Sequence, residues 1–298
     1  MLLAAGVHRI NMAPSARTAR NTVDNAARSG RHVAQREQQW LIPLGRAGFA
    51  ANGVVYLLVG VLAAQAALGV GGDTTDTGGV LGHIVEAPFG RVLLGITAVG
   101  LVGYALWRFL QAVLDTEHKG SEPKGLAARI GFGVAAASYA ALSMSAIGMA
   151  LGTRGQPDQE QATQDRTAWL MSHPLGPWLV VAAGAIVVGV GVAQFVIAYR
   201  ASFADKLVAV GETQQRLMGV SGRIGYSARG FVFLVIGLFL VLAGIQTSPD
   251  QARGLGGVLA VLAAEPLGPW LLGVVALGLA AYGVFMLLAA RYRRMVLS

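Results

Sequence analysis

Six long apolar stretches constrain the fold of this 298-residue chain more than any other feature. A membrane-spanning helix needs about 20 consecutive, mostly apolar residues. Only two charged residues, Arg108 and Arg229, lie within the stretches. The sequence therefore predicts an all-α membrane protein whose six transmembrane helices lie in the windows Ala47–Gly72, Val92–Leu114, Ile130–Thr153, Pro174–Tyr199, Ile224–Pro249 and Pro266–Ala290.

The composition agrees with extensive contact with lipid. Charged residues make up only 13% of the chain, against about 25% in an average soluble domain. The sequence has no cysteine, which excludes disulfides, thiolate nucleophiles and cysteine-ligated metals. The net charge of +8 does not indicate nucleic acid, since the charges flank the apolar stretches. Membrane lipids, and with them other membrane proteins, are the expected partners.

Basic and acidic residues alternate from one connection to the next. Arginine and lysine dominate before the first window, in the second and fourth connections, and after the last window. The first, third and fifth connections instead hold eight acids: Asp73, Asp76, Glu86, Asp158, Glu160, Asp165, Asp250 and Glu265. Because cytoplasmic segments carry the excess of basic residues, we expect a multi-pass protein of the plasma membrane with both termini in the cytoplasm.

The first 42 residues form a basic arm in which Asp24 and Glu37 are the only acids. This arm contains no apolar core of the length that a cleaved signal peptide needs. Both Met1 and Met12 fit a start of the chain. We expect residues 1–42 to be a disordered cytoplasmic tail, and the alternative is an arm that binds anionic lipid headgroups.

Two anchors recur three times along the chain, which indicates an internal repeat. The odd-numbered windows open with Arg-x-Gly-[Phe/Tyr], at Arg46 and Gly48, Arg129 and Gly131, and Arg223 and Gly225. The even-numbered windows open with Pro-[Phe/Leu]-Gly, at Pro88 and Gly90, Pro174 and Gly176, and Pro266 and Gly268, with Trp178 and Trp270 at the same offset in the last two. The units 43–114, 126–200 and 222–294 are therefore predicted to be parallel two-helix repeats, an arrangement that permits a pseudo-threefold axis and disfavours transporters built on inverted repeats.

The start of each even-numbered window has a structural interpretation. Proline is tolerated in the first turn of a helix, and tryptophan is favoured at the level of the lipid headgroups. The pattern predicts a cap where the helix meets the membrane. The apolar runs just before it, Val80–Val85, Trp169–Met171 and Leu255–Leu262, predict short amphipathic helices at the outer interface.

These anchors, together with the closing Tyr282 and Arg291-Tyr292-Arg293, resemble the bacterial membrane family known as domain of unknown function 1206. The resemblance covers about Pro43 to Arg294. It implies six membrane helices in three pairs and no established activity. The middle unit departs most from the pattern, because it has Ala135 and Ala136 where the third unit has Arg229 and Gly230, and it lacks the late tyrosine. It is the least favoured host for a site.

Arg229 is the strongest candidate for function. It lies about 7–8 Å into the fifth window, and an ionisable group inside a membrane is a functional hypothesis, with snorkelling to water as the alternative. Asn52 holds the same repeat position in the first window. With Tyr56 and Tyr139, these residues predict a polar site on the cytoplasmic side. Arg108, near the end of its window, is interpreted as a boundary anchor.

No motif for catalysis is present. The sequence has no phosphate-binding loop, no nucleophile elbow and no His-Glu-x-x-His. His83, Glu86 and His173 form only a weak metal-ligand pattern, so we expect no catalytic residue, cofactor or metal. The function that fits best is a non-enzymatic accessory or scaffold of the cell envelope. The alternatives are a small-solute transporter or channel near Asn52 and Arg229 and, with the least support, an enzyme acting on lipid.

Overall fold

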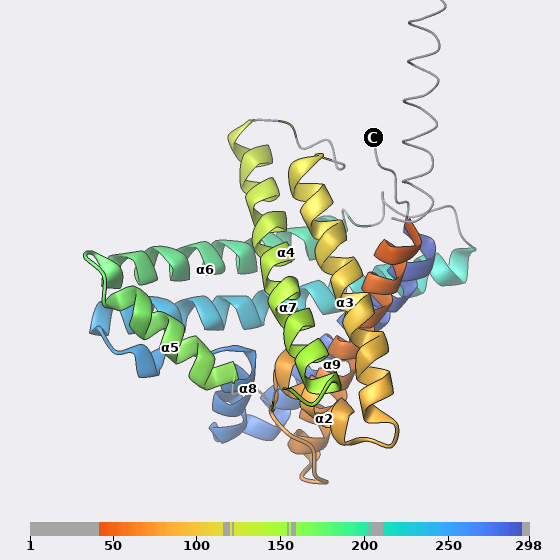
Figure 1. The fold of residues 1–298 in the computed structure, drawn as a ribbon, viewed down its shortest axis with the longest axis horizontal. Helices are drawn as coiled ribbons and strands as arrows, with labels where there is room; N and C mark the ends of the chain where they lie inside the picture. Colours follow the sequence, from red (N-terminus) through yellow and green to blue (C-terminus); the bar gives the residue numbers. More distant parts are fainter. Residues whose placement is uncertain are drawn as a thin grey trace, which may run out of the picture. The chain divides into compact units, whose positions relative to one another are not determined.

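The computed structural model describes residues 42–115, 120, 122–153, 155, 159–201, 203 and 211–293. The six predicted membrane-spanning helices are all present (Figure 1): the first helix, Ile42–Leu68, then α3 (Gly90–Val113), α4 (Pro123–Ala150), α6 (Gly176–Arg200), α7 (Glu212–Gln246) and α9 (Gly268–Tyr292). Each is long and apolar enough to cross a bilayer. The all-α fold with six such helices is therefore confirmed, while the predicted basic arm lies outside the described residues apart from Ile42.

Helix α7 is much longer than its apolar window. It begins at Glu212 rather than near Ile224, because the polar residues in between favour helix and include no proline. Arg229 consequently lies midway along α7 and not in its first turns. The short apolar runs form α2 (Thr77–Glu86), α5 (Gln159–Met171) and α8 (Leu255–Ala264), each just before an even-numbered helix.

The Pro-x-Gly motif is a tight turn that joins each short helix to the next long one. The amide of Gly90 donates to the carbonyl of Ala87 at 2.7 Å, and the same bond recurs at Gly176 and Gly268. Pro88, Pro174 and Pro266 occupy this turn, so their predicted place in the first helical turn was wrong. A Cβ atom at Gly90 would lie 2.2 Å from the carbonyl oxygen of Ile84, which explains the glycine. In α6 and α9 the proline of the first helical turn is the next one, Pro177 or Pro269, beside the exposed Trp178 or Trp270.

Small residues join each odd-numbered helix to the even-numbered helix of the neighbouring unit. The first helix packs on α9 through Gly53, where an added Cβ would lie 2.9 Å from the carbonyl oxygen of Gly283. In the same way α7 packs on α6 through Gly230 and Gly191. Helix α4 packs on α3, and the two helices lie side by side in Figure 1. Close approach of backbones through small residues is how membrane helices associate.

Within a unit, the two helices pack closely in the first and third units but not in the second. A Cβ atom at Gly48 would lie 2.4 Å from the backbone nitrogen of Tyr104, and one at Gly225 would lie 2.5 Å from the Cα of Tyr282. The equivalent Gly131 has no neighbouring atom within 4 Å. Among the described residues, α4 and α6 form no packed interface. The helices therefore follow one another in space as α4, α3, the first helix, α9, α7 and α6, with an opening between the two ends.

The sequence explains this opening. In the first unit Ala51 meets Gly100, and a Cβ atom at Gly100 would lie only 2.5 Å from that of Ala51. The third unit has the same pair of residue types, with Ala228 facing Gly278. The middle unit carries Val134 and Ile186 at these positions. Two branched side chains cannot fit where a methyl group and a hydrogen meet, so α4 and α6 stay apart.

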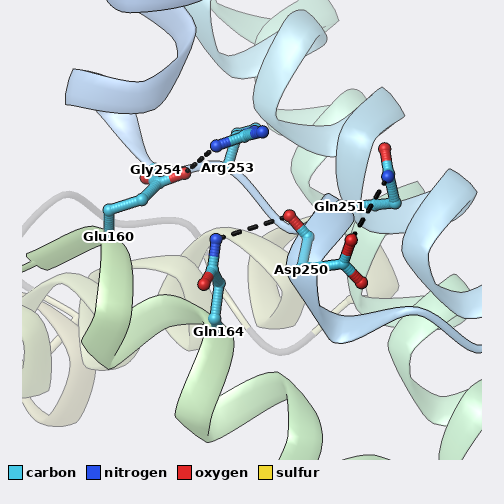
Figure 2. Close-up of polar contacts among 6 residues, drawn as sticks. All are labelled: Glu160, Gln164, Asp250, Gln251, Arg253 and Gly254. Carbon is cyan, nitrogen blue, oxygen red and sulfur yellow. Dashed lines mark hydrogen bonds and ion pairs between the residues drawn. The ribbon is translucent and has the colours of Figure 1, made fainter.

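The short helices meet near the start of α8, where acidic side chains cap helix N-termini. Glu160 of α5 forms an ion pair with Arg253 at 3.2 Å and accepts a hydrogen bond from the amide of Gly254 at 2.9 Å (Figure 2). Gly254 is the N-cap residue of α8 and has no side chain of its own. In the first unit the N-cap residue of α2, Asp76, caps the helix with its own side chain, which accepts hydrogen bonds from the amides of Gly78 and Gly79. A carboxylate from the middle unit thus caps a helix of the third.

The Asp76 cap predicts a pH-dependent stability. Burial and the nearby Glu160 carboxylate raise the pKa of Asp76 above its ordinary value, although its two amide bonds lower it. Since the folded-state pKa is raised, the stability that Asp76 contributes is greatest below the unfolded-state pKa and falls as the pH rises. We expect Asp76→Asn, which keeps the cap, to melt at or above the wild-type Tm at pH 7, with the difference vanishing toward pH 4. Asp76→Ala, which removes the cap, should lose about 1 kcal/mol at both pH values. A Tm for Asp76→Asn that is below wild type at pH 7 but not at pH 4 would contradict the sign.

Candidate functional site

Two arginines on different helices lie in one cluster of aromatic side chains, here called the arginine–tyrosine cluster. Arg108 of α3 donates to the hydroxyl of Tyr104 at 2.6 Å, and its guanidinium lies 5.6 Å from the ring centre of Phe132. Arg229 of α7 donates to the hydroxyl of Tyr282 at 2.5 Å and lies 4.3 Å from the centre of that ring. Cation–π contacts of this kind stabilise a charge that has left water.

The first helix joins the two halves of the cluster. Asn52 belongs to the half around Arg108, because its side-chain oxygen accepts a hydrogen bond at 2.9 Å from Tyr139, whose ring lies against Tyr104. Tyr56, one helical turn further along, belongs to the half around Arg229. Its ring packs edge-on against Tyr282 with 4.9 Å between the centres. The remaining members of the cluster are Phe49, Phe132, Tyr226, Phe233 and Phe285.

The four residues predicted as a polar site all lie in this cluster. Asn52 accepts a hydrogen bond from Tyr139, while Arg229 contacts the ring of Tyr56 but donates its hydrogen bond to the hydroxyl of Tyr282. Arg108, interpreted from the sequence as a boundary anchor, lies in the same cluster. Its side chain turns toward the cluster, one helical turn after Tyr104 on the same face of α3. That spacing of four residues was the available signal.

The arginines that open the odd-numbered helices have other positions. Arg46 and Arg223 are exposed at the surface. Arg129 donates through Nε to the carbonyl of Ala112 at 2.8 Å and through Nη2 to that of Val113 at 2.9 Å. It therefore satisfies the free carbonyls at the C-terminus of α3. In the Arg-x-Gly-[Phe/Tyr] motif it is the glycine, and not the arginine, that makes the close contact between helices in the first and third units.

The cluster has positive charge and hydrogen-bond donors in excess. Within the described part of the chain, neither Arg108 nor Arg229 forms an ion pair with a carboxylate. Three buried N–H groups of the cluster's described side chains have no acceptor: Asn52 Nδ2, Arg108 Nε and Arg229 Nε. Asn52 is fully buried. An unsatisfied buried donor costs about 1–3 kcal/mol, so the group that would complete this site is an acceptor, and an anion would also balance the charge.

Helix dipoles compensate the two charges unequally. Arg108 lies in the last turns of α3, where the partial negative charge of a helix C-terminus favours a cation. Arg229 lies midway along α7, where the dipole gives no such help. Its guanidinium is held by one hydroxyl and three aromatic rings. Arg229 is therefore the charge with the greater need of an anionic partner.

Beyond the cluster, buried apolar side chains follow toward α2 and α8. The inner face of the first helix continues as Val59 and Ala63, both fully buried. Leu81 of α2 and Leu259 of α8 are also fully buried. The residues named here on that side are therefore apolar and buried. The histidines near that side bond to their own helices, His83 to the carbonyl of Gly79 and His173 to that of Trp169, and the residues described contain no group of three potential metal ligands.

Comparisons with known proteins agree with the repeat. The family model described as Domain of Unknown Function (DUF1206) matches residues 47–115, 130–201 and 224–293. The chain is also 34% identical over 265 residues to the "Uncharacterized protein YxxB" of Bacillus subtilis (strain 168), a match that covers 88% of this chain and 95% of that protein. No solved structure matches.

Proposed function

Because the chain belongs to the family described as Domain of Unknown Function (DUF1206), which names no activity, we propose a role from the site itself. The protein is a non-enzymatic, multi-pass component of the cell membrane that binds an anionic group between Arg108 and Arg229. The single observation that carries this proposal is the set of buried N–H donors without acceptors around two guanidinium groups. Such donors bind carboxylate or phosphate oxygens strongly.

We place the site on the cytoplasmic side of the plasma membrane. Arg108 lies near the C-terminal end of α3, beside one of the basic connections. Basic connections favour the cytoplasm. Both termini would then be cytoplasmic, and membrane lipids and other membrane proteins would be the partners of an accessory or scaffold component.

A binding role fits the chemistry of the site better than a reaction. Arginine stays protonated at all accessible pH values, so neither guanidinium can act as a general base. General acid–base catalysis needs a group that gains and loses a proton near neutral pH. The tyrosines already accept hydrogen bonds from the arginines. The site is therefore suited to hold charge rather than to transfer a proton.

A transporter for a small anion is the second candidate. Its support is the position of Arg229 midway along a spanning helix, since intramembrane cations commonly mark the path of an ion. Against it stand the buried apolar residues beyond the cluster, Val59, Ala63 and Leu259. A conduit would have to pass these residues during each cycle. Uptake of phosphate by proteoliposomes that contain the purified protein would favour transport over the accessory role.

Substitution of the arginines tests anion binding directly. We expect inorganic phosphate to raise the Tm of the full-length protein in detergent. At a phosphate concentration of 100 times the Kd, the free energy of unfolding should rise by about 2.7 kcal/mol. Arg108→Gln and Arg229→Gln should each weaken phosphate binding by about tenfold or more, since each removes a charge-assisted hydrogen bond. Arg46→Gln, which removes an exposed arginine, is the matched control and should bind like wild type. If the double variant Arg108→Gln/Arg229→Gln binds phosphate as well as wild type does, the proposed site is wrong.

A further inference from the structure

We infer that the anionic group is the phosphate of a membrane phospholipid, whose acyl chains lie between α4 and α6 while its headgroup reaches Arg108 and Arg229. This inference rests on the proposed function and names the class of ligand. It combines two observations that are independent of each other. One is the excess of donors in the arginine–tyrosine cluster. The other is the absence of the α4–α6 interface in the middle unit.

The surfaces of α4 and α6 that correspond to the packed faces of the other two units, here called the middle-unit gap, are apolar and exposed. Val134 of α4 is 62% exposed and Ile186 of α6 is 68% exposed. Their counterparts in the other units, such as Gly100 and Gly278, are buried against the partner helix. Gly189 of α6, like Gly131, has no neighbouring atom within 4 Å. In a bilayer, exposed aliphatic surface of this kind is covered by lipid chains.

The gap leads to both halves of the cluster. Its first wall, α4, supplies Phe132 and Tyr139 to the half that contains Arg108. Its second wall, α6, packs along α7, which carries Arg229. A molecule that contacts both α4 and α6 is therefore one helix away from Arg108 on α3 and from Arg229 on α7. Both arginines are only partly buried.

An amphiphile matches this arrangement better than a free anion does. The donors and the two charges would bind phosphate oxygens, and the aliphatic walls at Ile130, Val134, Ile186 and Val190 would bind acyl chains. A free phosphate would use the arginines and leave the walls unpartnered.

A second copy of the chain fits the gap less well. The helix contact at Gly48 and Tyr104 requires small residues at the next turn. The bulk of Val134 and Ile186 that keeps the chain's own α6 away would equally keep away the α6 of another copy. The branched side chains instead leave a surface that flexible chains can cover. We therefore assign the gap to lipid.

Binding of defined lipids to the full-length protein tests the inference. Native mass spectrometry and thermal shift in detergent would compare phosphatidylglycerol with phosphatidylcholine of the same acyl chains, and with inorganic phosphate. We expect wild type to bind phosphatidylglycerol about tenfold or more tightly than phosphatidylcholine. A factor of ten in Kd corresponds to about one charge-assisted interaction. Arg108→Gln/Arg229→Gln should abolish this preference.

Variants of the gap separate the lipid from a free anion. Gly131→Trp places a large side chain where no atom lies within 4 Å, so the fold should tolerate it. Val134→Ala/Ile186→Gly/Val190→Tyr installs the residues of the first unit and should draw α4 onto α6. Both variants should weaken phosphatidylglycerol binding by about tenfold and leave binding of inorganic phosphate within about threefold of wild type, since the arginines are unchanged. Retention of Tm by either variant shows that it is folded.

Three results would overturn the inference. The first is equal affinity for the two lipids, and the second is phosphatidylglycerol binding that neither gap variant weakens. The third is that the protein forms a dimer without bound lipid and that Gly131→Trp dissociates this dimer. The gap would then be the contact surface for a second copy of the chain. A different result, phosphate binding that does not depend on Arg108 and Arg229, would sink the proposed function itself. The two failures are therefore distinguishable.

Discussion

Gly48→Ala and Gly225→Ala should each destabilise the protein by about 3 kcal/mol or more, while Gly131→Ala should not. The three glycines hold the same position in the repeat. The first two face the backbone of Tyr104 and Tyr282 at 2.4 and 2.5 Å from an added Cβ, and a backbone cannot move aside as a flexible side chain can. Thermal unfolding in detergent, followed by loss of the monodisperse peak in size exclusion, measures the effect.

Gly131→Ala is the matched control for these two variants. It faces open space, and alanine is a better helix former than glycine by about 1 kcal/mol. Its Tm should therefore equal or exceed that of wild type. Equal destabilisation at all three glycines would mean that α4 and α6 are packed like the other two pairs and that the middle-unit gap does not exist.

The second large effect is expected when the middle unit's residues are placed in the first unit. Ala51→Val/Gly100→Ile puts two branched side chains where a Cβ at Gly100 would already lie 2.5 Å from that of Ala51. The first helix should separate from α3, with a loss of stability of about 3 kcal/mol or more. The chain has no cysteine, so pairs of introduced cysteines carry spin labels on the two helices without background, and the distance between the labels reports the separation.

The converse exchange is the control. Val134→Ala/Ile186→Gly should bring α4 and α6 to the axial separation of packed helices, about 8–10 Å. Labels at Gly131 and Gly189 would then report a shorter distance than in the otherwise native chain. An unchanged distance in both exchanges would show that these two residue pairs do not decide which units close.

Much of the fold follows from local pattern in the sequence. Length and apolarity place the six spans, because a bilayer imposes both on a crossing helix. The short helices α2, α5 and α8 follow from apolar runs ahead of a recurring turn. The proline turn itself was misplaced, because proline fits the second position of a tight turn as well as the first turn of a helix. The hydrogen bond from the amide of Gly90 to the carbonyl of Ala87 identifies the tight turn.

The candidate site was predictable in part. Asn52, Tyr56, Tyr139 and Arg229 share repeat positions that place them on equivalent helix faces. The pairing of arginines with tyrosines was not predictable, because it depends on which helices become neighbours. Arg229 reaches Tyr282 across the α7–α9 interface, 53 residues away in sequence. The middle-unit gap follows from the bulk of Val134 and Ile186. It could not be predicted from the sequence, because the close contacts at the equivalent positions of the other two units are seen only in the structure.

The units of sequence and the units of structure do not coincide in this protein. Helix α4 belongs spatially with the first unit, and α6 belongs with the third. The second unit is thus shared between two three-helix halves, which meet along the first helix and α9 at Gly53 and Gly283. A cut in the connection between α4 and α5 would separate the two halves and would sever only the contact between the first helix and α9. The other close interfaces between long helices would each stay inside one of the two fragments. A chain divided at the borders of the repeat would instead sever the α3–α4 and α6–α7 interfaces, so the three repeated segments are not three separable pieces of the structure.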